Sequence, residues 1–331
     1  MIMKKRTTAT TSPAPNGSGV RERQHPFLLV NSGSGGGRAQ REIVAAATEL
    51  GIDHHVVGPG DDFGTVLSAA LERGADLLGA AGGDGTLCAV AGVAMEHDLP
   101  MVVVPAGTRN HFALDVGVDL DDPAGVLRAS LTAGHERRVD VGTVNGSTFL
   151  NNASLGMYPA AERRPGYRRH KAKAFVEAAR EAMSRDAGGE ARLTLSLPGS
   201  SVIDAGEGTS IVMLVNNAYS PGFAPGKRLR SRLDSGQVWV YVGSGLDLDT
   251  SGWGALVHDA ESILRQTALR AVAGVERVVI ASDRADVPIA VDGEDRPDLL
   301  APFDVASRAA ALRLLVPTDP GPRTVDVDLS W

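Results

Sequence analysis

The chain has 331 residues, of which 43% are apolar and 22% are charged, and its formal net charge is −7. This length is about twice that of a typical single domain, so we expect two domains that each bury an apolar core. The negative charge argues against nucleic acid as a partner, because phosphate backbones attract clustered Lys and Arg side chains.

Residues 1–25 are rich in Thr, Ser, Pro and Gly, and no apolar block follows their few basic residues. We therefore expect a disordered tail rather than a secretory signal, and a second, polar tail at residues 318–331. No apolar stretch approaches the roughly 18 residues that a membrane-spanning helix needs. The single cysteine, Cys88, excludes an intramolecular disulfide and is typical of a reducing compartment, so we expect a cytoplasmic protein.

Residues 26–135 alternate short apolar runs with segments of helical periodicity. Strands are expected at residues 27–30, 54–57, 75–81 and 101–104, and helices at residues 40–50, 65–73 and from residue 87 to about 96. The alternation predicts an α/β domain with a doubly wound, mainly parallel sheet. In such sheets, ligands bind at the carboxyl ends of the strands.

Residues 136–317 follow a different pattern. Short, partly alternating apolar runs occur at residues 139–144, 147–151, 191–197, 209–216, 237–242, 278–280, 287–291 and 312–316. Asn145-Gly146 is a hairpin signal between the first two runs. This half is predicted to be mainly β, as a sandwich or distorted barrel, with helical inserts at about residues 169–184 and 254–272.

The segment Gly82-Gly83-Asp84-Gly85-Thr86 lies between a predicted strand and a predicted helix. Its glycines allow backbone N–H groups to approach a phosphate closely at the helix N-terminus. The Asp84 carboxylate would repel that phosphate unless a cation or a transferable proton lay between them, which indicates Mg²⁺ or acid–base chemistry. The alternative is a tight turn in which Asp84 caps the helix. The chain has neither a Walker A loop nor a dinucleotide fingerprint after Gly33.

Three further segments place polar residues at predicted strand ends. The loop 31–37, which begins with Asn31, is suited to contact a ribose or phosphates, or is simply a flexible loop. Thr108 and Asn110 are suited to bind sugar or phosphate, or to cap a helix. Asp292-Gly293-Glu294 fits a general base beside a magnesium or sugar ligand, and a hairpin turn explains it equally well.

In this order, the four segments resemble the diacylglycerol kinase catalytic family, which includes sphingosine and ceramide kinases and bacterial lipid kinases. The resemblance runs from about residue 26 to residue 316. The Gly-Gly-Asp-Gly-Thr element is shared with NAD kinases, whereas the late Asp-Gly-Glu element favours the lipid branch. The resemblance implies a nucleotide-binding α/β domain at residues 26–135, a β-rich lipid domain at residues 136–317 and an active site in the cleft between them.

The resemblance also implies ATP and Mg²⁺ as cofactors, and transfer of the γ-phosphate to the hydroxyl of diacylglycerol or a related lipid alcohol. Asp292 would be the general base with Glu294 beside it, and Asp84 would be a rival base or a magnesium ligand. Arg169 belongs to a basic stretch that would neutralise phosphates or anionic lipid heads, or that merely begins a solvated helix. The residues expected to bind ATP are Asn31, Ser32, Gly33, Ser34, Gly35, Gly82, Gly83, Gly85, Thr86, Thr108, Asn110 and Arg169.

Two positions depart from the family pattern. His111 stands where the family usually has Asp, and Ser235 replaces the second Asp of an element linked to a structural magnesium, so that Asp234 alone remains as a ligand there. The alternatives are therefore a kinase of a soluble acceptor such as NAD, or a nucleotide- or lipid-binding homologue with impaired catalysis. We also expect contact with the membrane surface during turnover and allow for a homodimer.

Overall fold

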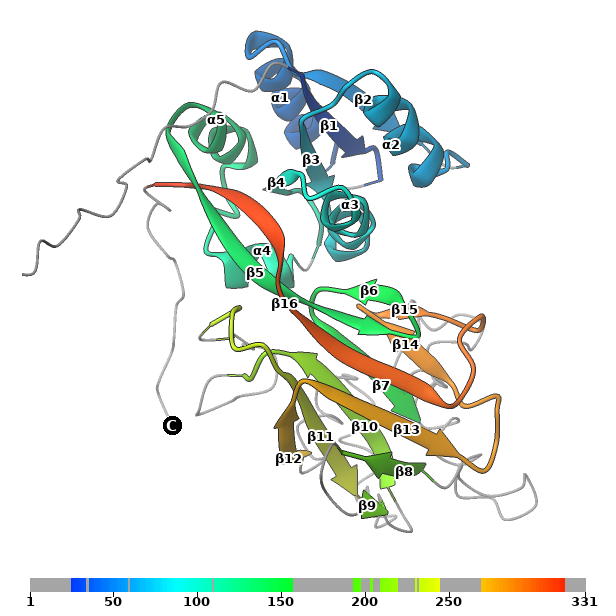
Figure 1. The fold of residues 1–331 in the computed structure, drawn as a ribbon. Coiled ribbons are helices and arrows are strands. Elements are labelled where there is room, and N and C mark those ends of the chain that lie inside the picture. Colours follow the sequence, from blue (N-terminus) through cyan, green and yellow to red (C-terminus); the bar gives the residue numbers. More distant parts are fainter. Residues whose placement is uncertain are drawn as a thin grey trace, which may run out of the picture.

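The computed structural model describes residues 25–33, 36–58, 60–108, 110–156, 193–197, 203–204, 209–219, 230, 232–244 and 269–318. Figure 1 shows two parts, an α/β part at the top and a β part below it, joined by two long strands. The helices lie in the first part, and the strands continue through both.

The first part contains four parallel strands, each followed by at least one helix. The strands are β1 (Pro26–Asn31), β2 (Asp53–Val57), β3 (Leu77–Gly82) and β4 (Pro100–Pro105). The helices are α1 (Gly36–Glu49), α2 (Phe63–Glu72), α3 (Asp84–Glu96), α4 (His111–Val116) and α5 (Pro123–Ala133). The strand order β2-β1-β3-β4 and the parallel pairing confirm the predicted α/β class.

The apolar runs of this sheet are continuous because both faces are covered. In β1, Phe27 and Leu29 enter a core formed with α2, α3 and α4, whereas Leu28 and Val30 enter a second core formed with α1 and α5. Successive strand residues point to opposite faces, so a strand with helices on both sides must be apolar at every position. The sheet is therefore doubly wound, and its carboxyl edge carries the glycine-rich loops.

The remaining strands form a β part of two packed sheets. They are β5 (Gly134–Val144), β6 (Ser147–Phe149), β7 (Asn152–Gly156), β8 (Leu193–Ser196), β9 (Ile203–Asp204), β10 (Thr209–Asn216), β11 (Val238–Ser244), β12 (Leu269–Val275), β13 (Arg277–Ser282), β14 (Ile289–Val291), β15 (Glu294–Asp295) and β16 (Phe303–Pro317). One sheet has the order β12-β11-β10-β7-β14-β15, and its neighbouring strands pair antiparallel. Val212, Leu214 and Val240 of this sheet share a core with Val278 and Val305 of the other sheet, as in a sandwich.

Two strands run from one part of the molecule to the other (Figure 1). β16 pairs with β13 near its start and lies parallel to β4 near its end, while β5 accompanies it along most of its length. The register of the β5–β16 pair shifts between Arg308 and Leu312, where Ala310 has a φ of 51°. The sequence predicted strand only at residues 312–316 because the alanine-rich start of β16 carries a weak apolar signal.

The hairpin predicted at Asn145-Gly146 is confirmed between β5 and β6, where both residues have positive φ angles of 48° and 83°. The helix predicted at residues 254–272 is wrong at its end. Leu269–Val275 is the strand β12, because these residues pair antiparallel with β11. The rest of that helix, the helix at residues 169–184 and both terminal tails lie outside the described residues.

Candidate active site

The glycine-rich loops at the ends of β1, β3 and β4 lie against one another. A Cβ on Gly107 would collide with the Cα of Gly83, and a Cβ on Gly82 would lie within 2.5 Å of Thr86. The Asn31 side chain donates to the Thr86 hydroxyl at 2.8 Å. Thus three of the predicted nucleotide segments meet at the carboxyl edge of the sheet, and side chains are excluded where the backbones touch.

The N-terminus of α3 differs from those of two neighbouring helices. Asp62 caps α2 and Asp122 caps α5, each by accepting a hydrogen bond from a backbone N–H of the first turn. Gly83 precedes α3 and provides no side-chain cap. The backbone N–H groups of the first turn are therefore available to an anion, and the helix dipole favours negative charge at this point.

Asp84 connects this turn to the next helix. Its Oδ2 accepts a hydrogen bond from the backbone N–H of His111 at 3.2 Å, and its Oδ1 accepts from the N–H of Phe112 at 3.0 Å. The carboxylate thus caps the short helix α4. The alternative interpretation of the sequence, in which Asp84 caps its own helix, is wrong, because Gly83 is the N-cap of α3 and Asp84 is its first residue. His111, the departure from the family pattern, contributes its backbone to this contact, and its side chain is exposed.

Asp292 lies in the turn between β14 and β15, where Asp292 and Gly293 have positive φ angles of 49° and 83°. Its Oδ2 accepts from the Leu150 N–H at 2.8 Å, and its Oδ1 accepts from the N–H groups of Asn151 and Asn152 at 2.8 and 3.0 Å. Burial raises the pKa of Asp292 from 3.8 to about 6 against the opposing effect of these three donors. The hairpin turn that the sequence also allowed is therefore present, and it holds the half-buried Asp292 carboxylate against residues 150–152.

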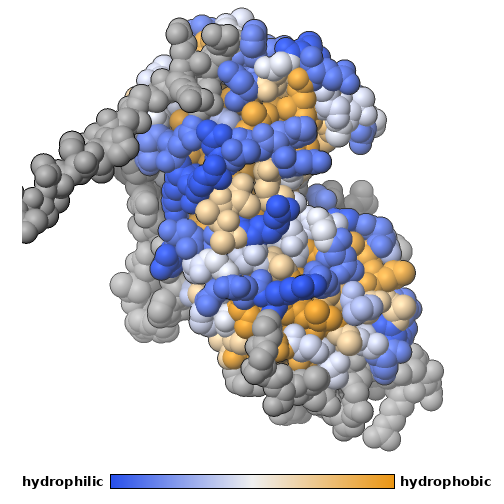
Figure 2. Space-filling model, in the orientation of Figure 1, coloured by the Kyte–Doolittle hydropathy of each residue, from blue (hydrophilic) through white to orange (hydrophobic). Residues whose placement is uncertain are grey.

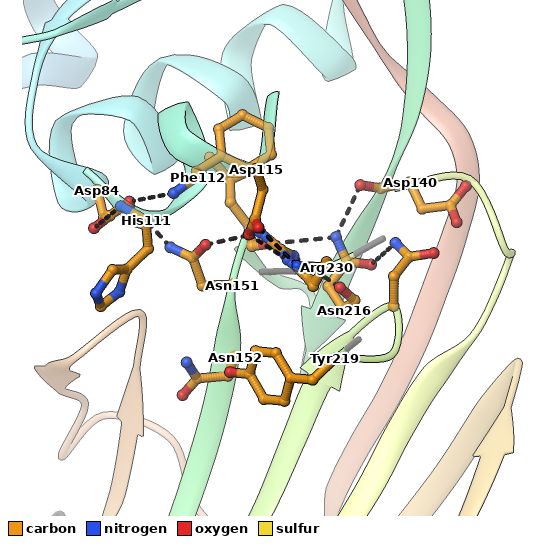
Figure 3. Close-up of polar contacts among 12 residues, drawn as sticks. Asp84, His111, Phe112, Asp115, Asp140, Asn151, Asn152, Asn216, Tyr219 and Arg230 are labelled. Carbon is orange, nitrogen blue, oxygen red and sulfur yellow. Dashed lines mark hydrogen bonds and ion pairs between the residues drawn. The ribbon is translucent and has the colours of Figure 1, made fainter. Parts of the chain in front are cut away.

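Asn151 hydrogen-bonds to both carboxylates, and Figure 3 shows its contact with Asp84. Its backbone N–H donates to Asp292, and its side-chain Nδ2 donates to Asp84 Oδ1 at 3.1 Å. Glu294 approaches from the same hairpin, because a Cβ on Gly85 would collide with the Glu294 carboxylate. The structure therefore brings together Asp84, Gly85, Asp292 and Glu294, which come from opposite ends of the sequence.

Other predicted site residues lie apart from this network. The Asn110 side chain forms two local hydrogen bonds with Gly107, and Thr108 is exposed beside it. Ser32 and Gly33 are also exposed, and Gly33 donates to the Asn31 side chain. Ser34, Gly35 and Arg169 lie outside the described residues.

The predicted magnesium ligand Asp234 is exposed and pairs with Arg232 at 2.9 Å. Beside it, the Ser235 hydroxyl donates to Asn217 at 2.6 Å. Among the described residues, no hydrogen bond links Asp234 to Asp84 or Asp292, and no group of three or more His, Cys, Asp or Glu side chains is arranged to hold a metal ion. Nor does the described part contain a helix that is long and apolar enough to cross a bilayer.

A buried polar cluster around Arg230 and Asp115 was not predicted from the sequence. The Arg230 side chain is 1% exposed and forms an ion pair with Asp115, whose side chain is 3% exposed, at 2.7 Å. Burial raises the pKa of the Asp115 carboxyl, and Arg230 opposes this rise. The sequence feature that could have indicated this cluster is a pair of Asn-Asn dipeptides, at residues 151–152 and 216–217. The first lies at the start of β7 and the second at the end of β10.

Comparison with known proteins finds sequence similarity in the first part of the chain. The family model "Diacylglycerol kinase catalytic domain" matches residues 25–144. The chain is 34% identical over 134 residues to the "Probable lipid kinase YegS-like" of Pseudomonas aeruginosa, an alignment that covers 39% of this chain and 43% of that protein. It is 40% identical over 107 residues to the diacylglycerol kinase of Bacillus subtilis, which covers 31% of this chain and 34% of that protein. These alignments span less than half the length of the curated relatives.

The fold is similar over a longer range. A crystal structure of a diacylglycerol kinase from Bacillus anthracis superposes with a TM-score of 0.60 at 19% identity, covering 89% of this chain and 98% of that one. This similarity supports the two-part architecture, and the matches at higher identity fall on the first part. Residues 25–144 are therefore similar to diacylglycerol kinase catalytic domains, and the chain as a whole is similar in fold to a bacterial diacylglycerol kinase.

Proposed function

We propose that the protein transfers the γ-phosphate of ATP to the hydroxyl group of a lipid alcohol, with diacylglycerol as the first acceptor to test. The observation that carries this proposal is the pairing of Asp84 and Asp292 through Asn151, beside an uncapped helix N-terminus. Residues 26–135 would bind the nucleotide and residues 136–317 the acceptor. The names of the relatives support lipid as the acceptor class.

Asp292 is suited to act as the general base. Among the described residues, its hydrogen-bond partners are three backbone N–H groups and the weakly donating Cys88 thiol, so the acceptor's hydroxyl would displace only the thiol. A pKa of about 6 keeps the group mostly ionised at neutral pH, yet makes it a better proton acceptor than an ordinary Asp. In this step the acceptor oxygen bonds to the γ-phosphorus, the bond to ADP breaks, and the proton moves to Asp292.

Asp84 has a donor set that fits Mg²⁺. Among the described residues, its Oδ2 accepts one hydrogen bond, from the His111 N–H, which leaves a lone pair for a cation. Mg²⁺ in kinases is often held by one or two carboxylates together with substrate phosphates and water. Bound there, the ion would neutralise charge on the transferred phosphate. Glu294 accepts no hydrogen bond from the described residues and faces Gly85, so it is available to orient the acceptor.

Lipid acceptors would be met at a membrane surface. Figure 2 shows hydrophobic residues at the surface of the β part on the face that it draws, among hydrophilic ones. This mixed surface is compatible with peripheral contact during turnover. We propose no particular oligomeric state, and a homodimer is tested simply by measuring the mass in solution.

The test is incubation of the protein with γ-labelled ATP, Mg²⁺ and a total lipid extract, followed by identification of the labelled species. A parallel reaction contains NAD and no lipid. Label in a lipid, lost in Asp292→Ala and Asp84→Ala variants that remain folded, supports the proposal. Label in NAD supports the soluble-acceptor alternative, and ATP binding without any transfer supports an impaired homologue.

A further inference from the structure

Arg230 is a buried cation that the proposed reaction does not use. Its Nε donates to Asp115 at 2.7 Å, and its backbone N–H donates to the same carboxylate at 2.8 Å. The guanidinium also lies over the Phe112 ring, with 6.0 Å between its central carbon and the ring centroid. A buried charge of this kind is costly unless all of its donors are used, so the position of each donor is informative.

The remaining donors are directed at the segment that holds the two candidate carboxylates. Nη1 donates to the backbone carbonyls of Leu150 and Asn216 at 2.6 and 2.7 Å, and Nη2 donates to Asn151 Oδ1 at 2.9 Å. Asn216 reinforces this arrangement, since its backbone N–H donates to the Asn151 carbonyl at 3.0 Å. The Arg230 guanidinium thus binds Leu150 and Asn151, the two residues that precede β7. The backbone N–H groups of these same residues donate to Asp292.

The contact with Asn151 also fixes the orientation of an amide. A guanidinium can only donate, so it must face the oxygen of the Asn151 side chain and not its nitrogen. The nitrogen is then directed at Asp84, to which it donates at 3.1 Å. Figure 3 shows this chain of contacts from Asp115 through Arg230 and Asn151 to Asp84.

We propose that Arg230, paired with Asp115, is a positioning residue for phosphate transfer. It holds residues 150–152 in place, so that their N–H groups bind Asp292 and the Asn151 amide binds Asp84. Asp115 lies on α4, the helix that Asp84 caps, so the pair also ties the α/β part to the β part. The catalytic part of this inference rests on the proposed function, whereas the positioning of the loop does not.

The variant that tests it is Asp115→Leu/Arg230→Met, because removing both members of a buried ion pair is often tolerated, whereas removing one leaves an unpaired charge. We expect kcat to fall at least about tenfold while the KM for ATP changes less than about twofold, since the interaction lost orients reacting groups. The control is Arg277→Met/Asp304→Leu, which removes an exposed ion pair and should leave kcat unchanged. If the double variant does not fold, Arg230→Lys replaces it, because lysine keeps the charge but cannot reach all four acceptors.

A second comparison separates positioning from general damage to the structure. If Arg230 acts partly through the Asn151 amide, Asn151→Leu alone lowers kcat, and the Asp115→Leu/Arg230→Met change then causes a smaller loss than it does in the native background. Losses that multiply would overturn the proposal, and so would a folded Asp115→Leu/Arg230→Met variant with normal kcat.

A third measurement does not depend on activity. Hydrogen exchange of the backbone N–H groups of residues 150–152 should accelerate at least about tenfold in the double variant, while the strands β1 and β3 keep their protection. Unchanged exchange at residues 150–152 would refute the positioning role even if no acceptor were found. Conversely, faster exchange in a protein that transfers no phosphate would refute the proposed function and leave the positioning of the loop intact.

Discussion

The Asp292→Asn variant separates the catalytic role of this residue from its effect on the free energy of unfolding. In the native protein the carboxyl has a pKa of about 6, and in the unfolded chain it returns to about 3.8. The native state therefore binds this proton more tightly than the unfolded state does. The resulting stability is present below pH 4 and is lost as the pH rises through 6.

The size of this loss follows from the pKa difference. Over the range from pH 4 to pH 8, ionisation of Asp292 removes roughly 2–3 kcal/mol from the free energy of unfolding. The Asp292→Asn variant does not ionise and is not subject to this loss. Its amide nitrogen faces one backbone N–H, and because both groups are donors this hydrogen bond is lost, at a cost of about 1–3 kcal/mol that is the same at every pH. We therefore expect the stability of the variant, relative to the native protein, to improve by roughly 2–3 kcal/mol between pH 4 and pH 8.

The assay is denaturant unfolding of both proteins at the two pH values, with transfer of labelled phosphate to lipid measured in parallel. Activity should fall about 10²–10⁴-fold, as expected when a general base is removed. Asp298→Asn is the control, because Arg296 lowers the pKa of Asp298 and the pH trend should have the opposite sign. A relative stability that does not change with pH would refute the burial argument, and retained activity would refute the catalytic one.

Two further predictions concern contacts that a single side chain would disturb. Gly85→Ala should reduce phosphate transfer at least about tenfold, because its methyl group would displace the Glu294 carboxylate. The control is Gly92→Ala in the same helix, where the added methyl group meets only an ordinary contact. This variant should stabilise the protein by about 0.5–1 kcal/mol. Kinetics and thermal unfolding of both variants check this, and equal activities would contradict it. Asp115→Ala leaves Arg230 buried without its carboxylate and should cost about 3–5 kcal/mol of stability, measured by denaturant unfolding; a loss below about 1 kcal/mol would mean that the ion pair contributes little.

The elements of the α/β part could be predicted because their signals are local. The apolar run of β1 ends at Asn31, and glycines follow it, so both the strand and its loop are encoded within a few residues. The turn at Asp292-Gly293 is local in the same way, since both residues tolerate the positive φ angles that a tight hairpin requires. The nature of the candidate site, glycine loops facing acidic residues, was therefore visible in the sequence.

The connections within the site were not visible, because they depend on which strands pair. Asn151 lies 67 residues from Asp84 and 141 residues from Asp292, and it meets both only after β7 has paired with β14 and β10. No local signal distinguished Arg230, which the fold buries against Asp115. The sequence by itself determined the loops, the turn and the residue types of the site. Tertiary structure decided which of them share hydrogen bonds and how burial raises the pKa of Asp292, because both depend on neighbours that are distant in the chain.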